Sequence, residues 1–178
     1  VRKAGGIIIA DEVQPGFGRT GAAFWGHEVA GFTPDIVTMG KPMGNGHPVA
    51  AVATSLDIMS AFRKAFGYFN TFGGNPVSCA AANAVLDVLE QDNLMQNAFD
   101  TGHYMKAALQ KLADKHSIIG DVRGHGLAIG VELVSDKKSK QPATAEAERV
   151  VNMMRQKGVL MGSNGIANNV LKIRPPMP

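Results

Sequence analysis

The chain has 178 residues, of which 45% are apolar and 19% charged, and its formal net charge is +3. This composition is ordinary for a globular protein, and the dispersed basic residues without interleaved aromatics argue against a nucleic-acid-binding surface. No apolar run reaches the roughly 18–20 residues that span a bilayer and no signal peptide is visible, so we expect no membrane insertion and a cytoplasmic location.

The single cysteine, Cys79, cannot form an internal disulfide, which fits a reducing compartment. The chain starts at Val1, almost inside an apolar run, and stops at Pro178 without a closing element. We therefore expect a fragment of a longer protein. Such a fragment would lack the rest of any active site, so we expect it to be inactive alone.

Two short apolar runs dominate the beginning of the chain. Residues 6–10 lead directly into Asp11, and residues 35–39 lead into Lys41. Their β-branched residues, bounded by Gly and Pro, predict two strands buried on both faces. Each strand carries an ionisable residue at its C-terminal end, where open α/β sheets bind ligands. This pair matches pyridoxal phosphate, which needs a lysine for its Schiff base and an acid facing its pyridinium nitrogen.

Each of these features also has a purely structural interpretation. Asp11 alone would more often make an Asx turn or cap a helix. The glycine-rich loop 15–24 lets backbone approach a ligand closely, but glycines make ordinary turns as well. Lys41 lies on a tight turn between Gly40 and Pro42, where a lysine is usually solvated. The preceding buried strand favours instead a desolvated, more nucleophilic amine with a lowered pKa.

The rest of the chain predicts an alternation of helices and strands. We expect a third strand over 49–54, in a hairpin, and a helix over 55–65 that is capped by Ser55. A possible domain boundary lies between about 91 and 100. The other predicted elements are helices over 77–89, 94–117 and 144–157, strands over 127–133, 159–161 and 169–174, a turn at 118–126 and a solvated loop at 135–142.

The turn at 71–74 precedes the helix predicted from residue 77. Free N–H groups, the helix dipole and the Thr71 hydroxyl together suit an anion. A plain capped helix explains this spacing equally well. We expect His27 to be a surface or supporting residue, and Arg123 and His125 to be structural.

Several of these motifs together resemble the class III aminotransferases, which are fold-type-I pyridoxal-phosphate enzymes. The resemblance covers nearly the whole chain in order and rests on the stretches 9–21, 34–41, 71–76 and 172–177. It implies an α/β fold in which residues 1–95 belong to a large cofactor-binding domain with a mostly parallel sheet. Residues 96–178 would then form a small α+β domain, truncated at its end.

The resemblance implies roles for particular residues. Asp11 would pair with the pyridine nitrogen, and Gln14 would hydrogen-bond the 3-oxygen side of the ring. Lys41 would bind the cofactor covalently and shuttle protons. Thr71 would contact the cofactor phosphate across the interface of a homodimer. No residue is expected to bind a metal.

The C-terminal motif departs from the pattern of many relatives. They hold an arginine three residues before the Pro-Pro pair as a bidentate clamp for the substrate carboxylate, whereas this chain has Lys172 there. Lys172 and Arg174 share one face of the last strand and are the expected substrate-binding residues. Because lysine lacks the guanidinium fork, an amino-acid carboxylate need not be the native ligand.

The likeness is strongest to the branch that contains alanine–glyoxylate aminotransferase 2-like proteins and ethanolamine-phosphate phospho-lyases. We expect transfer of an amino group from an amine or amino acid to a keto acid. The alternative is a phospho-lyase that expels phosphate from phosphoethanolamine or a similar amine, and the sequence leaves this choice open.

Two other classes of protein remain. A non-catalytic relative, or a surface for dimerisation only, would bind no cofactor covalently. A nucleotide-binding module is the weakest hypothesis, because the loop 16–21 lacks the lysine-serine/threonine ending of a P-loop.

Overall fold

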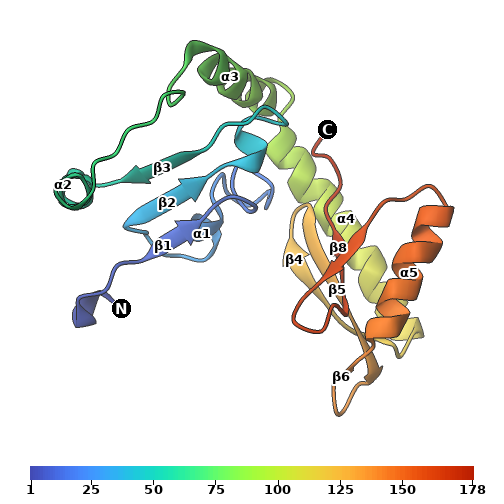
Figure 1. The fold of residues 1–178 in the computed structure, drawn as a ribbon. Helices are drawn as coiled ribbons and strands as arrows, with labels where there is room; N and C mark the ends of the chain where they lie inside the picture. Colours follow the sequence, from blue (N-terminus) through green and yellow to red (C-terminus); the bar gives the residue numbers. More distant parts are fainter. The chain divides into compact units, whose positions relative to one another are not determined.

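The computed structural model describes residues 1–178 and divides them into two compact units. The first unit comprises residues 1–18 and 23–95, and the second comprises residues 19–22 and 96–178. Each unit has its own sheet, and helices accompany both sheets (Figure 1). The mixture confirms the predicted α/β class.

A three-stranded mixed sheet forms the first unit, in the order β1-β2-β3 (Figure 1). The strands are β1 (Ile9–Asp11), β2 (Ile36–Met39) and β3 (Ala51–Thr54). β1 and β2 are parallel, with Asp11 opposite Thr38, whereas β2 and β3 are antiparallel. The antiparallel pair confirms that the third strand is a hairpin partner of the second.

The first strand is shorter and more exposed than the sequence predicts. It covers Ile9–Asp11 instead of 6–10, so Asp11 ends the strand and does not follow it. Ile7 and Ile9 are 53% and 56% exposed, and Ala10 alone is buried. The expectation of two strands buried on both faces is therefore wrong for this chain, because β1 is an edge strand and β2 is only half-buried along its length.

Short helical elements and two longer helices complete the first unit. They are η1 (Arg2–Ala4), α1 (Gly26–Val29), η2 (Lys41–Met43), α2 (Leu56–Ala65) and α3 (Pro76–Gln91). Ser55 caps α2 as predicted, since its hydroxyl accepts the Ile58 N–H at 3.4 Å. Helix α3 begins at Pro76, a residue suited to the first helical position because no partner is needed for its missing N–H.

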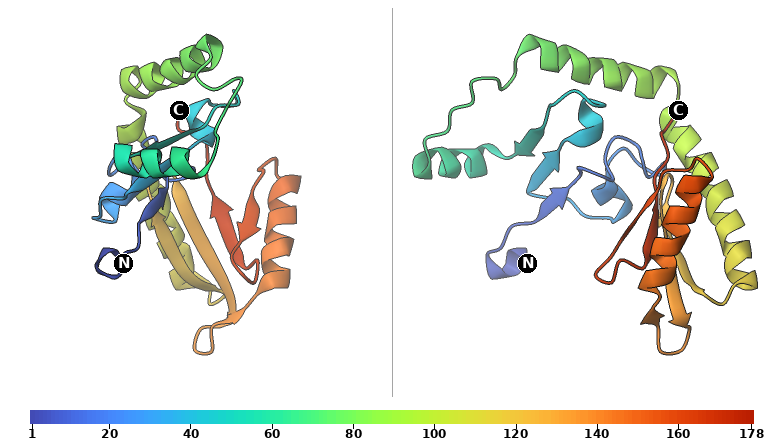
Figure 2. Two further views of the ribbon diagram at one scale, coloured as in Figure 1. Left: turned by 60° about the vertical axis from the view of Figure 1, so that its left-hand side comes forward. Right: turned by 45° about the vertical axis from the view of Figure 1, so that its right-hand side comes forward.

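The second unit is built on an antiparallel sheet in the order β4-β5-β8-β7, with β6 paired to β5 (Figure 2). The strands are β4 (Ile119–His125), β5 (Ala128–Asp136), β6 (Gln141–Pro142), β7 (Gly162–Asn164) and β8 (Val170–Ile173). The helices are α4 (Leu94–Lys115), whose first two residues belong to the first unit, and α5 (Thr144–Gln156).

Alternate residues of β5 build the core of the second unit. Ile129, Val131 and Leu133 are at most 3% exposed, because side chains on a strand point to opposite faces in turn. Val131 and Leu133 pack with Ala147 of α5, and Leu109 of α4 lies against the same cluster. The core therefore joins the sheet to both helices of this unit.

Three predicted segments of the second unit differ from the structure in secondary structure. The predicted turn at 118–126 is strand β4, whose pairing with β5 overrides its glycines. The segment 135–142 is exposed as predicted, but it is not all loop, because β5 continues to Asp136 and the short strand β6 closes a hairpin on β5. The strand predicted at 159–161 lies instead at Gly162–Asn164, where it pairs with β8.

Candidate active site

The parallel pair β1–β2 places two ionisable residues at one edge of the first sheet. Parallel strands end at the same edge, and Asp11 is the last residue of β1. Lys41 follows two residues after the end of β2. The structure therefore brings the predicted acid and the predicted amine to the same edge of one sheet.

Asp11 is exposed and has one fixed contact. Its Oδ1 accepts the N–H of Val13 at 3.0 Å, which is the Asx-type turn that the structural interpretation predicts. Its second carboxylate oxygen has no partner within the chain. Gln14, three residues on, is exposed as well. The turn thus orients the Asp11 carboxylate and leaves one oxygen for a ligand.

The backbone of Lys41 is strained. Gly40 is extended and Lys41 has a φ of +40°, the left-handed region that non-glycine residues rarely adopt. Such a conformation costs on the order of 1–3 kcal/mol and tends to occur at functional sites. The Lys41 side chain is exposed, so the expected desolvated amine is not found in this chain, where no segment covers it.

A buried carboxylate supports this edge and was not recognised in the sequence. Glu12, next to Asp11, is 1% exposed. It accepts the backbone N–H groups of Gly26 at 2.7 Å and His27 at 2.8 Å, and its Oε1 lies 2.8 Å from Nδ1 of His27. Glu12 therefore ties the end of β1 to the start of α1, and His27 has the supporting role that was expected.

A second network holds the turn that carries Lys41. His47 Nε2 lies 2.8 Å from the Ser78 hydroxyl, which is buried at the start of α3. Asn75 Nδ2 donates to the same hydroxyl at 2.9 Å, and Asn75 Oδ1 accepts the Ser78 N–H at 3.0 Å. These contacts fix the loop after Lys41 to the first turn of α3.

The turn before α3 only partly matches the predicted anion site. Asn70 Oδ1 accepts the N–H groups of Phe72 at 3.2 Å and Gly73 at 3.0 Å, so these donors are not free as expected. Short polar side chains satisfy their own neighbouring backbone in this way. Thr71 is exposed and its hydroxyl has no partner in the chain. The hydroxyl is thus a donor that this turn still offers.

Lys172 and Arg174 lie in the second unit and line one pocket of about 300 Å³. Arg123 of β4 lines it too, and its guanidinium pairs with Asp121 at 2.8 Å and with Glu132. Hydrogen bonds to Asp121 and Glu132 raise the pKa of Arg123 above its ordinary value. The expected structural role of Arg123 agrees with these pairs, but its place in the pocket depends on β4, which the sequence did not predict.

Arg19 secures the end of the last strand. Its guanidinium donates to the carbonyl of Leu127 at 3.2 Å and to that of Pro175 at 3.0 Å. Burial, and secondarily the charge of Arg174, lower the pKa of Arg19 below its ordinary value. Arg19 therefore holds the segment that follows Arg174.

No group of three or more His, Cys, Asp or Glu side chains is arranged to hold a metal ion. None of the helices has the length and apolar character that crossing a bilayer requires.

Similarity to known proteins agrees with this arrangement. The chain is 54% identical over 177 residues to the mitochondrial alanine–glyoxylate aminotransferase 2 homolog 2 of Arabidopsis thaliana, covering 99% of this chain and 37% of that protein. It is 47% identical over 180 residues to ethanolamine-phosphate phospho-lyase homolog 1 of Caenorhabditis elegans, covering 99% of this chain and 38% of that protein. The chain thus spans well under half the length of these relatives.

A solved structure shares the fold. It is a phospholyase from Arthrobacter in complex with phosphoethanolamine, with a TM-score of 0.93 and 45% identity over 99% of this chain and 42% of that chain. The family model of aminotransferase class III matches residues 1–178. This chain therefore belongs to the class III aminotransferase family.

Proposed function

We propose that the complete protein is a pyridoxal-phosphate-dependent aminotransferase that moves an amino group from an amine or amino acid to a keto acid. The observation that carries this proposal is the acid and the amine at one edge of the β1–β2 pair. Membership of the class III family supports it.

The residues at this edge suit the cofactor chemically. Asp11 offers an unpaired carboxylate oxygen to the pyridinium N–H, and Lys41 offers a primary amine to the cofactor carbonyl. Thr71 offers a hydroxyl to the phosphate, and Gln14 offers an amide to the 3-oxygen side of the ring. When bound, pyridoxal phosphate supplies an aromatic ring that accepts the electron pair released at the substrate carbon.

The chain's own residues would then hold and move protons. The Asp11 carboxylate keeps the proton on the pyridine nitrogen, since a nearby anion favours a cation. Lys41 Nζ would serve as the base that takes the proton from the substrate carbon bearing the amino group, once the substrate amine has taken the place of Lys41 at the cofactor. The strained backbone of Lys41 and the network from His47 to α3 would fix the direction of this side chain.

Covalent attachment of the cofactor tests the proposal. In the complete protein we expect borohydride to fix the cofactor on Lys41, detectable by peptide mass, and Lys41→Ala to abolish both this mass and the yellow colour. Lys64→Ala, at another exposed lysine of the first unit, is the matched control. An unmodified, colourless complete protein would refute the enzyme and favour the non-catalytic relative.

The second candidate is a phospho-lyase acting on phosphoethanolamine or a similar phosphorylated amine. Two cationic side chains, from Lys172 and Arg174, line one pocket and suit a dianionic group better than a single carboxylate. Phosphate and aldehyde release from phosphoethanolamine would be measured against amino transfer to pyruvate or glyoxylate. Amino transfer without phosphate release would rule out the phospho-lyase activity.

We further propose that 1–95 belongs to the large cofactor-binding domain, that 96–178 belongs to the small domain, and that the protein is a homodimer. The exposed side chains around Thr71, among them Phe69 and Phe72, support a covered surface in the assembly. Light scattering of the complete protein tests the dimer. A cytoplasmic location stays a prediction, and the Arabidopsis relative is named mitochondrial.

A further inference from the structure

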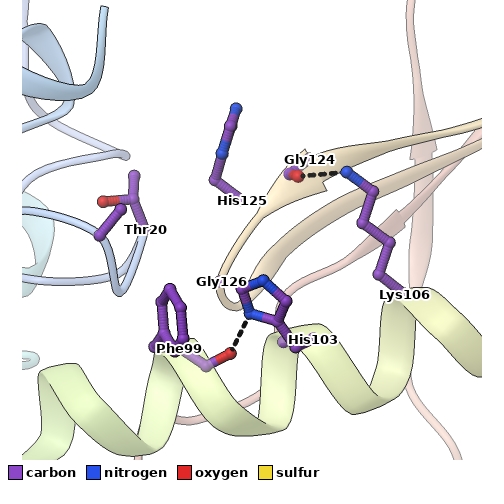
Figure 3. Close-up of a pocket in the computed structure, with 9 residues that line it drawn as sticks. Thr20, Phe99, His103, Lys106, Gly124, His125 and Gly126 are labelled. Carbon is purple, nitrogen blue, oxygen red and sulfur yellow. Dashed lines mark hydrogen bonds between the residues drawn. The ribbon is translucent and has the colours of Figure 1, made fainter.

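A pocket of about 340 Å³ lies wholly within the second unit (Figure 3). Its volume is in the range of small-molecule sites. It contains none of the residues assigned above to cofactor or substrate. Its walls come from the segment 19–22, helix α4 and the β4–β5 turn, through Thr20, Ala22, Phe99, Gly102, His103, Lys106, Gly124, His125 and Gly126.

The ionisable side chains of this pocket all carry nitrogen, and no carboxylate lines it. Lys106 Nζ donates to the Gly124 carbonyl at 3.1 Å, which fixes the amine at one wall (Figure 3). An ammonium group has three N–H donors, so two remain for a ligand. The pocket therefore holds a positioned positive charge without a counter-ion among its lining residues.

His103 is fixed in one tautomer by its backbone contact. Its Nδ1 lies 2.9 Å from the Phe99 carbonyl, which can only accept, so Nδ1 carries the hydrogen (Figure 3). Nε2 is then the ring nitrogen that is left for a ligand. The Phe99 ring lies 4.2 Å from the His103 ring, centroid to centroid, and adds an apolar wall.

His125 completes the pocket from the β4–β5 turn. It has no hydrogen-bond partner in the chain, so both ring nitrogens are open to a ligand. The turn itself is held closely, since a Cβ at Gly126 would meet the Arg19 carbonyl oxygen at 2.5 Å and a Cβ at Gly102 would meet the Gly126 backbone. The walls of the pocket are therefore set by backbone packing before any ligand binds.

We propose that this pocket binds a phosphate monoester, with its phosphate group among Lys106, His103 and His125 and a small organic group against Phe99. The three nitrogens come from two elements, and a phosphate presents three oxygens to them where a carboxylate presents two. Charge-assisted hydrogen bonds of this kind are the strong ones. Thr20 and Ala22 add no charge to the wall formed by segment 19–22.

Inorganic phosphate is the probe, titrated into the complete protein while the histidine side chains are followed by NMR. We expect the signals of His103 and His125 to shift with saturation, and that of His116, an exposed histidine outside the pocket, to stay in place. Acetate at equal ionic strength should not reproduce the shift. An absent or non-saturating response, or an equal response to acetate, overturns the proposal.

Two substitutions test the contacts. Lys106→Gln removes the charge but keeps an N–H for the Gly124 carbonyl, and we expect at least about tenfold weaker phosphate binding. His125→Gln, at a side chain with no hydrogen bond to lose, should also weaken phosphate binding. The controls Lys111→Gln and His116→Gln, both outside the pocket, should leave binding unchanged.

A further variant separates this pocket from the proposed cofactor site. Thr71→Val removes the hydroxyl that we assign to the cofactor phosphate, and it should leave the His103 and His125 shifts intact. The proposed phosphate site would be refuted if Thr71→Val lost those shifts. It would also be refuted if Lys106→Gln, with a wild-type urea midpoint, bound phosphate as tightly as the wild type. Neither result would contradict the proposed aminotransferase activity.

Discussion

The two units differ in how much of their apolar surface the chain itself covers. In the second unit the sheet and two helices share a buried cluster that includes Val131, Leu133 and Ala147. In the three strands of the first unit, Ala10 is the one fully buried side chain. Large side chains stay exposed from α2 to the start of α3, among them Phe66, Tyr68, Phe69, Phe72 and Val77.

The comparison teaches that the two sheets have different requirements. An antiparallel sheet is stable with one face covered, and the second unit supplies that cover through α4 and α5. A parallel pair such as β1–β2 normally has both faces covered, but in this chain part of the sheet surface stays exposed. The first unit therefore depends on packing partners that the second unit does not need.

Hydrogen exchange of the 178-residue chain should reveal the largest difference. We expect the amides of β5 and β8 to exchange at least about a hundredfold more slowly than those of β1 and β3, because buried strands open only with the core. Mass spectrometry of peptides from each strand measures the rates. Equal protection of the two sheets would break the comparison.

Leu133→Ala tests the core of the second unit. Leu133 is 2% exposed, so the truncation should lower the free energy of unfolding by about 3 kcal/mol, as buried leucines do. Urea titration with a probe in the second unit measures it. Leu160→Ala is the matched control, since Leu160 is 91% exposed and should change stability by less than about 0.5 kcal/mol.

Glu12→Gln tests the hydrogen bonds by which the buried Glu12 carboxylate connects β1 to α1. The new amide group would confront an N–H donor from Gly26 or His27, and we expect a loss of about 2 kcal/mol. Thermal and urea unfolding measure it, with the exposed Glu90→Gln as control. A neutral effect would mean that this carboxylate does not hold α1 on β1.

Asp35 gives a pH-dependent difference. The N–H of Ile8, and then the Arg2 guanidinium, lower the pKa of Asp35 below its ordinary value of 3.8. A lowered pKa in the folded state stabilises above the unfolded value, and this contribution is lost as the pH falls through the folded value. The urea midpoint of Asp35→Asn should therefore fall less than that of the wild type when the pH is lowered from neutral to about 3. Parallel curves would contradict this.

Ile9→Ala should have the smallest effect. Ile9 is 56% exposed on β1, so in the 178-residue chain we expect a change within about 0.5 kcal/mol. The same substitution in the complete protein should cost more if another segment covers this strand. Urea unfolding of both forms provides the test, and equal small effects would show that the strand stays uncovered.

Much of the local structure could be predicted because its causes lie within a few residues. Ser55 caps α2 as predicted. Helix α5 covers Thr144–Gln156, which is close to the helix predicted over 144–157. Lys41 falls on the expected tight turn because Pro42 fixes its own φ and Gly40 leaves the backbone free to turn. The hairpin β2–β3 follows from the sharp turn between its strands.

The features that sequence reasoning missed depend on distant partners. Glu12 alternates with Val13 like a solvent-facing residue, and its burial follows from N–H groups fourteen and fifteen residues away. Strand β4 contains Gly120 and Gly124, which indicate a turn in the sequence, but Gly124 pairs with Ile129 of β5 and Gly120 lies at an irregularity of the same pairing. The pocket shared by Arg123, Lys172 and Arg174 exists only once β4 is a strand.

The assignment of residues 19–22 to the second unit has a consequence for protein engineering. A cut at residue 95 leaves behind Arg19, whose guanidinium holds the carbonyls of Leu127 and Pro175. A chimera that exchanges the C-terminal unit between two relatives must therefore transfer this four-residue insert along with it. Exchanging residues 96–178 as one contiguous block would otherwise separate Arg19 from the carbonyls of Leu127 and Pro175 that it binds.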